Sequence, residues 1–216
     1  RELLKELKGL VKIYKIGTEL FTAHGWKSVE LVKEAGAEVF LDLKLHDIPT
    51  TVAKTSRVIT ERGVLMFNVH ALGGLEMMCQ ARKAVDETAR KGAKPLLLAV
   101  TVLTSLEEGV LAKELGIQRS LQEEVLALAR LAKTAGLDGV VSSPEETEFL
   151  RKELGKNFLL VAPGIRPSGS DPNDQRRSLT PTEAIQKGAN YLVVGRPITA
   201  ATEPRQVVRQ ILQSLA

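Results

Sequence analysis

Leu41-Asp42-Leu43-Lys44-Leu45-His46-Asp47-Ile48-Pro49-Thr50-Thr51 is the stretch of sequence that decides how this chain is interpreted. It follows a strand-like run, residues 37–40, and leads into a helix-like run over residues 52–61. Alternate side chains of a strand share one face, so Asp42 and Lys44 are expected to point the same way. In a barrel that direction is inward, where a buried Asp/Lys pair is costly unless it serves a purpose.

Strand-like runs rich in Val, Ile and Leu alternate with amphipathic helix-like runs along the whole chain. Short, continuous apolar strands are typical of a parallel sheet covered on both faces. The predicted strands are Lys12–Gly17, Ala37–Leu43, Val64–Val69, Lys94–Thr101, Asp138–Ser142, Phe158–Ala162 and Tyr191–Val194. The predicted helices are Arg1–Lys8, Ala23–Ala35, Thr51–Glu61, Gly73–Lys91, Leu121–Thr134, Glu145–Leu154, Pro181–Lys187 and Pro204–Ser214.

This strict alternation predicts an α/β fold, a (βα)8 TIM barrel, with a doubly wound sheet as the alternative. Residues 1–216 are expected to form a single catalytic domain, since the length suits one core. Only seven strands are predicted, and the chain opens on a helix-like run. We therefore expect the first strand of the barrel to lie upstream of Arg1 in the full protein.

Composition excludes several classes of protein. The chain is 44% hydrophobic and 26% charged, as is usual for a soluble globular domain. A net charge of +4 does not predict nucleic-acid binding, because the basic residues are scattered among acids and aromatic residues are few. We also find no apolar run of the roughly 18 residues that a membrane helix requires. The single Cys79 excludes an internal disulfide and favours a reducing, cytoplasmic location.

Polar residues gather where the predicted strands end, which is the active-site face of a barrel. Lys15 ends the first predicted strand, Asp42 and Lys44 the second, and Asn68 and His70 follow the third. A lone Asp/Lys pair is as often a structural ion pair as a catalytic one. Lys15 and Asp47 extend the pair to two cations and two acids, which favours catalysis. A lone histidine in the position of His70 is more often a hydrogen-bonded packing residue than an acid or base, and Thr104 and Ser105 stay ambiguous on chemistry alone.

The loops after the last two predicted strands have the composition of a phosphate site, which barrels commonly build there. Pro163-Gly164-Ile165-Arg166 and Gly195-Arg196 offer two guanidinium groups for bidentate contacts with phosphate oxygens. Gly195 permits close approach of the backbone, and a short helix after it is expected to present amide groups. The loop over residues 167–175 is expected to close on the ligand, with Gln175 contacting the anion. The alternative is a solvated loop with an ordinary arginine.

Together these motifs resemble the bacterial-type orotidine 5′-phosphate decarboxylase family. The resemblance rests on the stretch 42–51 and on Tyr14–Phe21, and later segments are similar as well. Those later segments are Asn68–Ala71, Val100–Ser105, Pro163–Arg166 and Val193–Ile198. The similarity extends over nearly all 216 residues.

The resemblance implies a carboxy-lyase that converts orotidine 5′-phosphate to uridine 5′-phosphate and CO₂, the last step of UMP biosynthesis, without cofactor or metal. Lys44 would protonate C6 of the pyrimidine, and Asp42 would lie beside the departing carboxylate, flanked by Lys15. Asp47 and Thr51 would reach the site of a partner in a homodimer. The implied substrate-binding residues are Lys15, Asp42, Lys44, His46, Asp47, Ile48, Pro49, Thr50, Thr51, Thr104, Pro163, Arg166, Gln175, Gly195 and Arg196. An aspartate on the family's first strand has no counterpart here.

Two other functions compete with this interpretation. Sugar-phosphate decarboxylases and aldolases of the same suprafamily carry a similar Asp-x-Lys-x-x-Asp motif and use Mg²⁺. Lys15 and the continuation Asp47-Ile48-Pro49-Thr50 argue against them. A phosphate-binding barrel without catalytic activity is disfavoured by the complete set of two lysines and two aspartates.

Overall fold

A computed structural model describes residues 1–89, 93–167 and 179–215 of the chain. Its seven strands form one parallel sheet in the order of the sequence, from β1 at one edge to β7 at the other. The strands are β1 (Ile13–Gly17), β2 (Glu38–Leu45), β3 (Met66–His70), β4 (Leu96–Val100), β5 (Gly139–Val141), β6 (Leu159–Ala162) and β7 (Tyr191–Leu192).

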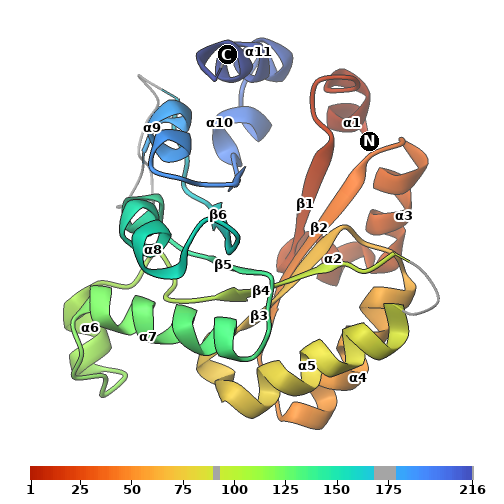
Figure 1. Cartoon of the computed structure of the whole chain (residues 1–216). Coiled ribbons are helices and arrows are strands. Elements are labelled where there is room, and N and C mark those ends of the chain that lie inside the picture. Colours follow the sequence, from red (N-terminus) through yellow and green to blue (C-terminus); the bar gives the residue numbers. More distant parts are fainter. Residues whose placement is uncertain (90–92, 168–178, 216) are drawn as a thin grey trace.

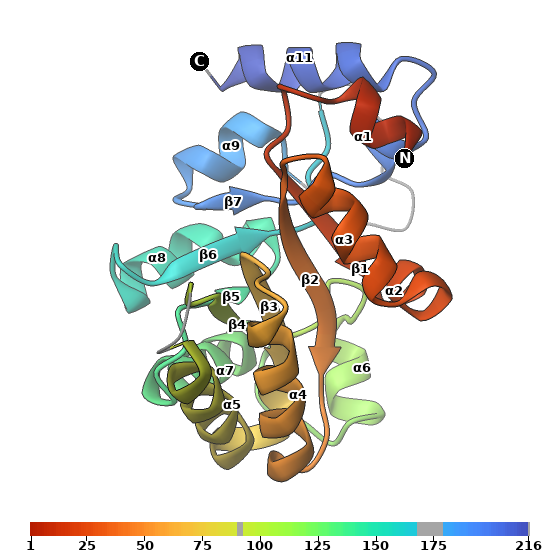
Figure 2. The ribbon, with the colours of Figure 1, turned by 90° about the vertical axis from the view of Figure 1, so that its right-hand side faces the viewer.

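Helices surround this sheet on its outer face and at its two edges, while the sheet curls around its inner face (Figure 1; Figure 2). They are α1 (Glu2–Glu6), α2 (Thr18–His24), α3 (Trp26–Glu34), α4 (Pro49–Glu61), α5 (Gly74–Ala89), α6 (Glu108–Lys113), α7 (Leu121–Thr134), α8 (Thr147–Leu154), α9 (Pro181–Gln186), α10 (Arg196–Thr199) and α11 (Pro204–Ser214). Two 3₁₀ turns, η1 (Ala71–Gly73) and η2 (Pro144–Glu146), follow β3 and β5. The parallel order and the curl confirm the TIM-barrel architecture over the doubly wound sheet, with seven strands among the described residues.

Two predictions about helices were wrong. The single helix expected over Ala23–Ala35 is two helices, α2 and α3, which meet at Gly25. Gly25 has φ 54° and ψ −145°, a conformation open to glycine but not to residues with a Cβ, and so it ends one helix and starts the next. Helix α6 was not predicted, because it has only six residues and one fully buried side chain, Leu111.

Alternation along the strands divides the core into two layers. Phe40, Met66 and Leu98 pack together on the inner side of the curled sheet. Their chain neighbours Leu41 and Phe67 belong to the larger layer between sheet and helices. Side chains that continue the inner row past Phe40 therefore point into the mouth of the barrel at the carboxyl ends of the strands.

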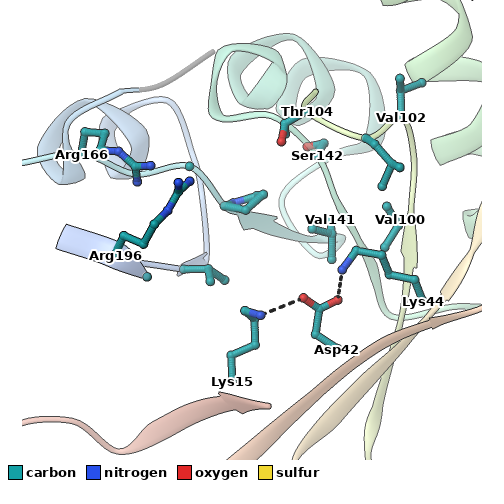
Figure 3. Close-up of a pocket in the computed structure, with 15 residues that line it drawn as sticks. Lys15, Asp42, Lys44, Val100, Val102, Thr104, Val141, Ser142, Arg166 and Arg196 are labelled. Carbon is teal, nitrogen blue, oxygen red and sulfur yellow. Dashed lines mark hydrogen bonds and ion pairs between the residues drawn. The ribbon is translucent and has the colours of Figure 1, made fainter. Parts of the chain in front are cut away.

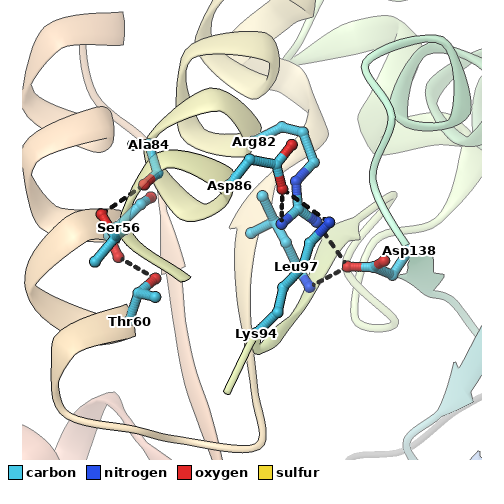
Figure 4. A network of polar contacts seen from close by, with 9 residues as sticks. Ser56, Thr60, Arg82, Ala84, Asp86, Lys94, Leu97 and Asp138 are labelled. Carbon is cyan, nitrogen blue, oxygen red and sulfur yellow. Dashed lines mark hydrogen bonds and ion pairs between the residues drawn. The ribbon is translucent and has the colours of Figure 1, made fainter. Parts of the chain in front are cut away.

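A charged network fastens α5 to the opposite, amino-terminal end of the sheet (Figure 4). The Arg82 guanidinium, 7% exposed, lies 2.8 Å from the Asp86 carboxylate and 2.9 Å from that of Asp138. Asp138 also accepts the Leu97 N–H at 2.7 Å, and Lys94 pairs with Asp86 at 2.8 Å. Each carboxylate has more than one donor, so the network orients the start of β4 and β5 without leaving either acid unpaired.

Helices α1 and α11 lie side by side above the sheet, where the Arg205 guanidinium donates to the Glu6 carbonyl at 2.5 Å (Figure 1). An apolar cavity of about 380 Å³ is lined by residues of both sheet edges and α11, among them Ile13, Tyr191 and Ile211. In the part of the chain that the structure describes, no helix combines the length and apolar character needed to cross a bilayer.

Candidate active site

Three of the four predicted charged residues form one cluster at the carboxyl ends of β1 and β2. The Asp42 carboxylate receives the Lys15 ammonium at 3.2 Å and the Lys44 ammonium at 2.7 Å, one on each oxygen. The register of β1 against β2 places Gly17 opposite Asp42. A Cβ at position 17 would lie 3.1 Å from the Lys15 nitrogen, so glycine leaves room for the amine beside the carboxylate.

Asp42 is the buried member of this cluster. Its side chain is 11% exposed, whereas those of Lys15 and Lys44 are 35% and 37% exposed. Burial by itself raises the pKa of the carboxyl, but Lys15, Lys44 and a hydrogen bond from Asn68 outweigh it and hold the pKa below its ordinary value. Asp42 is therefore an anion at neutral pH, with a cation on either side.

The cluster lines a cavity of about 260 Å³, and polar groups approach this cavity from three directions (Figure 3). Lys15, Asp42 and Lys44 lie along one side, Arg166 and Arg196 along a second, and Thr104 and Ser142 along a third (Figure 3). Apolar side chains complete the wall: Val100, Val102, Leu103, Val141 and Val193. A flat ring with polar substituents on several edges suits such a lining.

The two arginines predicted to bind phosphate come together as expected. Arg166 follows β6 and is 8% exposed, while Arg196 begins α10 directly after Gly195. Pro163 and Gly195 also line the cavity. A Cβ at Gly195 would meet nothing within 4 Å, so its absence leaves open space beside the arginines.

The short helix after Gly195 is present but offers fewer amide donors than expected. Pro197 has no N–H, and the N–H groups of Ile198 and Thr199 both donate to the Gly195 carbonyl, at 2.9 and 3.0 Å. The two guanidinium groups are the charged groups at this end of the cavity that can bind an anion.

The remaining predicted residues lie outside the cavity lining. Asp47 is exposed, and its carboxylate accepts the N–H of Ile48, its own neighbour, at 2.6 Å. Ile48 is 64% exposed. His46, Pro49, Thr50 and Thr51 belong to the same loop and to the first turn of α4, and none of them contributes to the wall of the cavity. Gln175 lies outside the described residues, as do residues 168–175 of the loop that was predicted to close on the ligand.

His70 packs beneath this loop instead of facing the cavity. Its ring stacks on that of His46 at 5.5 Å between centroids, and its Nδ1 accepts the Leu72 N–H at 3.3 Å. Burial, together with the charges of His46 and Lys44, lowers the pKa of His70 to about 4. It is neutral at pH 7 and caps η1, which agrees with a packing role.

Sequence reasoning missed Ser142, which lies in the cavity wall and is 2% exposed. Its position directly after β5 was the available signal, because residues after barrel strands face the site. Among the described residues there is no group of three or more His, Cys, Asp or Glu side chains arranged to hold a metal ion.

Comparison with known proteins gives a consistent result. Residues 1–211 match the family model described as "Orotidine 5′-phosphate decarboxylase / HUMPS family". A protein of Moorella thermoacetica named orotidine 5′-phosphate decarboxylase is 50% identical over 97% of this chain and 84% of its own length.

Two solved structures share the fold over most of both chains. An uncharacterized conserved protein from Geobacillus kaustophilus gives a TM-score of 0.87 at 36% identity, covering 100% of this chain and 93% of the other. Orotidine 5′-phosphate decarboxylase from Lactobacillus acidophilus gives 0.82 at 38% identity, covering 93% and 85%.

Proposed function

The chain belongs to the orotidine 5′-phosphate decarboxylase / HUMPS family, and on that premise we propose that it converts orotidine 5′-phosphate to uridine 5′-phosphate and CO₂. The observation that carries the proposal is the three-sided cavity. Its arginine side matches a phosphate, its Lys15–Asp42–Lys44 side matches a carboxylated ring carbon, and its Thr104 side matches the polar edge of a pyrimidine.

The chemistry requires a group that stabilises a localised carbanion. Breaking the bond from C6 to the carboxylate leaves the electron pair in the plane of the ring, where the π-system delocalises it poorly. In our proposal the Lys44 ammonium stabilises this charge as it forms and then transfers a proton to C6. At about 4 Å and an effective dielectric of about 20, one such contact is worth roughly 4 kcal/mol, or about three powers of ten in rate.

Asp42 has two roles in this proposal. It holds Lys15 and Lys44 at 3.2 and 2.7 Å, and it places a negative charge beside the substrate carboxylate. The repulsion is relieved when CO₂ departs, so it favours the transition state over the bound substrate. Arg166 and Arg196 would supply binding energy at the far end of the substrate, and Gly195 would leave room for the phosphate.

We further propose that the active form is a homodimer in which Asp47 and Thr51 reach the partner's cavity. Both residues are exposed in the single chain, and Ile48 beside them is a large apolar side chain at 64% exposure. Contact with a second copy would remove the apolar surface of Ile48 from water. The single cysteine, Cys79, favours a cytoplasmic enzyme.

The test is the disappearance of orotidine 5′-phosphate, followed by ultraviolet absorbance with EDTA present. Turnover that survives the chelator supports the metal-free reaction. Turnover that appears only with Mg²⁺, or only with a sugar phosphate, would replace the proposal with the related metal-dependent chemistry.

A further inference from the structure

The strand that carries Asp42 and Lys44 departs from regular pairing at these residues. Leu41 of β2 lies opposite Phe67 of β3, but Leu45 lies opposite Val69. Three residues of β2, 42–44, therefore face a single residue of β3, Asn68. Within this bulge Lys44 has φ 51°, the only positive φ of a non-glycine residue among those described.

A left-handed backbone is unfavourable for lysine and persists only where the surroundings hold it. The regular alternation of side chains along a strand therefore does not explain why the Lys44 side chain points into the cavity. Some contact must maintain this conformation, and the hydrogen bonds of Asn68 supply it.

Asn68 is fully buried, and one amide group bridges both functional residues. Its Oδ1 accepts the backbone N–H of Lys44 at 2.8 Å, and its Nδ2 donates to Oδ1 of Asp42 at 2.7 Å. That same Asp42 oxygen binds the Lys44 ammonium at 2.7 Å. The amide has one possible orientation, because a backbone N–H only donates and a carboxylate only accepts.

We propose that Asn68 is a positioning residue for the decarboxylation, holding the Lys44 backbone in its left-handed conformation and locking the Asp42 carboxylate between the two lysines. The proposal rests on the function proposed above. Asn68 is absent from the cavity wall, so it acts through Asp42 and Lys44 and not by contact with substrate.

Loss of Asn68 should therefore lower kcat more than it raises KM. A misplacement of about 1 Å at a reacting group costs up to about 100-fold in rate. The phosphate end of the site is built from the loops after β6 and β7, whereas Asn68 bonds to residues of β2. We expect kcat of Asn68→Ala to fall about 10- to 100-fold, with KM changed by less than about threefold.

Asn68→Asp gives a readout that a merely structural role would not produce. The aspartate keeps an acceptor for Lys44 N–H but donates to Asp42 only when protonated. Two carboxyl groups in contact share a proton, which raises the apparent pKa of the pair. The ratio of variant to wild-type kcat should therefore rise as the pH falls from about 8 to about 5. That ratio should stay flat for Asn68→Ala.

Within the single chain the other titratable groups near Asp42 and Lys44 are Lys15 on β1, His46 after β2 and His70 on β3, and in the proposed homodimer the partner's Asp47 would join them. All are present in wild type and variant alike, so the ratio of rates cancels their own titration to first order. Thermal melting at each pH corrects for any loss of folded protein.

Asn190→Ala is the matched control. The Asn190 Oδ1 also bridges a backbone N–H and a charged side chain, accepting from Leu160 N at 2.9 Å and from Arg151 at 2.6 Å. It lies before β7, away from the cavity wall. We expect this control to lose stability and keep its kcat.

The outcomes separate the two proposals. A lower kcat in Asn68→Ala, or rescue of Asn68→Asp at low pH, supports the positioning role. Wild-type kcat in the Asn68 variants, or an equal fall in kcat of the control, overturns it while the function stands. Wild-type protein without any turnover would refute the function and the positioning role with it. If Asn68→Ala does not fold, Asn68→Asp, which has the same shape, decides.

Discussion

Replacing Lys44 by methionine tests the proposed mechanism most directly, because it removes the ammonium and keeps an unbranched side chain that lacks only the terminal atom. The backbone of Lys44 is held by Asn68 through its N–H, a contact that does not involve the side chain. The variant should therefore fold with the same bulge in β2, and Asp42 should keep its contact with Lys15 at 3.2 Å.

The size of the effect follows from the position of the charge. In the open cavity the Lys44 side chain is 37% exposed, so solvent screens it. When substrate fills the cavity, an effective dielectric of about 20 at about 4 Å gives roughly 4 kcal/mol, or about three powers of ten in rate. Loss of the proton donor adds a further factor of about 100 to 10,000. We expect kcat to fall by at least about 1,000-fold.

The assay is decarboxylation followed by ultraviolet absorbance, with the affinity for uridine 5′-phosphate measured by calorimetry. Affinity should change little, because the arginines that would hold the phosphate lie on the other side of the cavity. Lys152→Met on α8 is the control, since that side chain is 73% exposed and pairs only with Glu148 among the described contacts. A Lys44→Met enzyme that keeps more than about a tenth of the wild-type kcat would refute the reasoning.

Three further predictions follow from other parts of the structure. Arg196→Ala should weaken binding of uridine 5′-phosphate about 100-fold, because one charge-assisted contact with phosphate is worth about 2–3 kcal/mol. The variant should leave uridine binding unchanged, and so should the control Arg209→Ala on the surface of α11. Equal losses of affinity for uridine 5′-phosphate and for uridine would contradict the assignment of Arg196 to the phosphate. Mixing inactive Asp47→Ala and Lys44→Ala proteins should restore up to about a quarter of the activity per site if Asp47 serves the partner's cavity. Random exchange of subunits makes half of the dimers mixed, and one of the two sites in each mixed dimer is then intact. No recovery after verified exchange of subunits would place Asp47 in the site of its own chain. His70 should make the protein less stable in acid, because folding lowers its pKa from 6.5 to about 4. The contribution of His70 to the free energy of unfolding is complete above pH 6.5, and about 3 kcal/mol of it is lost as the pH falls toward 4. His70→Asn keeps an acceptor for the Leu72 N–H without titrating, so urea unfolding at pH 7 and pH 4 should show a smaller loss than in wild type, and equal losses would exclude His70 as the cause.

Most of the fold was predictable because its signals are local. Apolar strands alternating with amphipathic helices predict a parallel, helix-covered sheet. Helices α7 and α11 have the predicted bounds. The errors arose where a single backbone conformation decided the outcome, as at Gly25, or where a helix was too short to show periodicity, as in α6.

The site was predictable to the extent that barrel geometry places strand ends together. Knowing that Lys15 and Asp42 end neighbouring strands was enough to expect their contact. Arg166 and Arg196, thirty residues apart, meet for the same reason. The identity of the reaction came from the resemblance of the motif around Asp42 to a known family, and the match of residues 1–211 to that family's model agrees with it.

The sequence by itself determined which residues stand at the mouth of the barrel, because strand order and strand ends follow from local pattern. Only the tertiary structure decided in which direction the side chains of these residues point. The turn of Lys44 into the cavity depends on a bulge opposite β3, and the lock on Asp42 depends on the amide of Asn68, 26 residues away. Asp47 lies outside the lining of the cavity in its own chain, and its carboxylate accepts the Ile48 N–H just before α4. The contacts of Asn68 join residues far apart in the sequence through hydrogen bonds that have strict direction, and no periodicity along the chain encodes them.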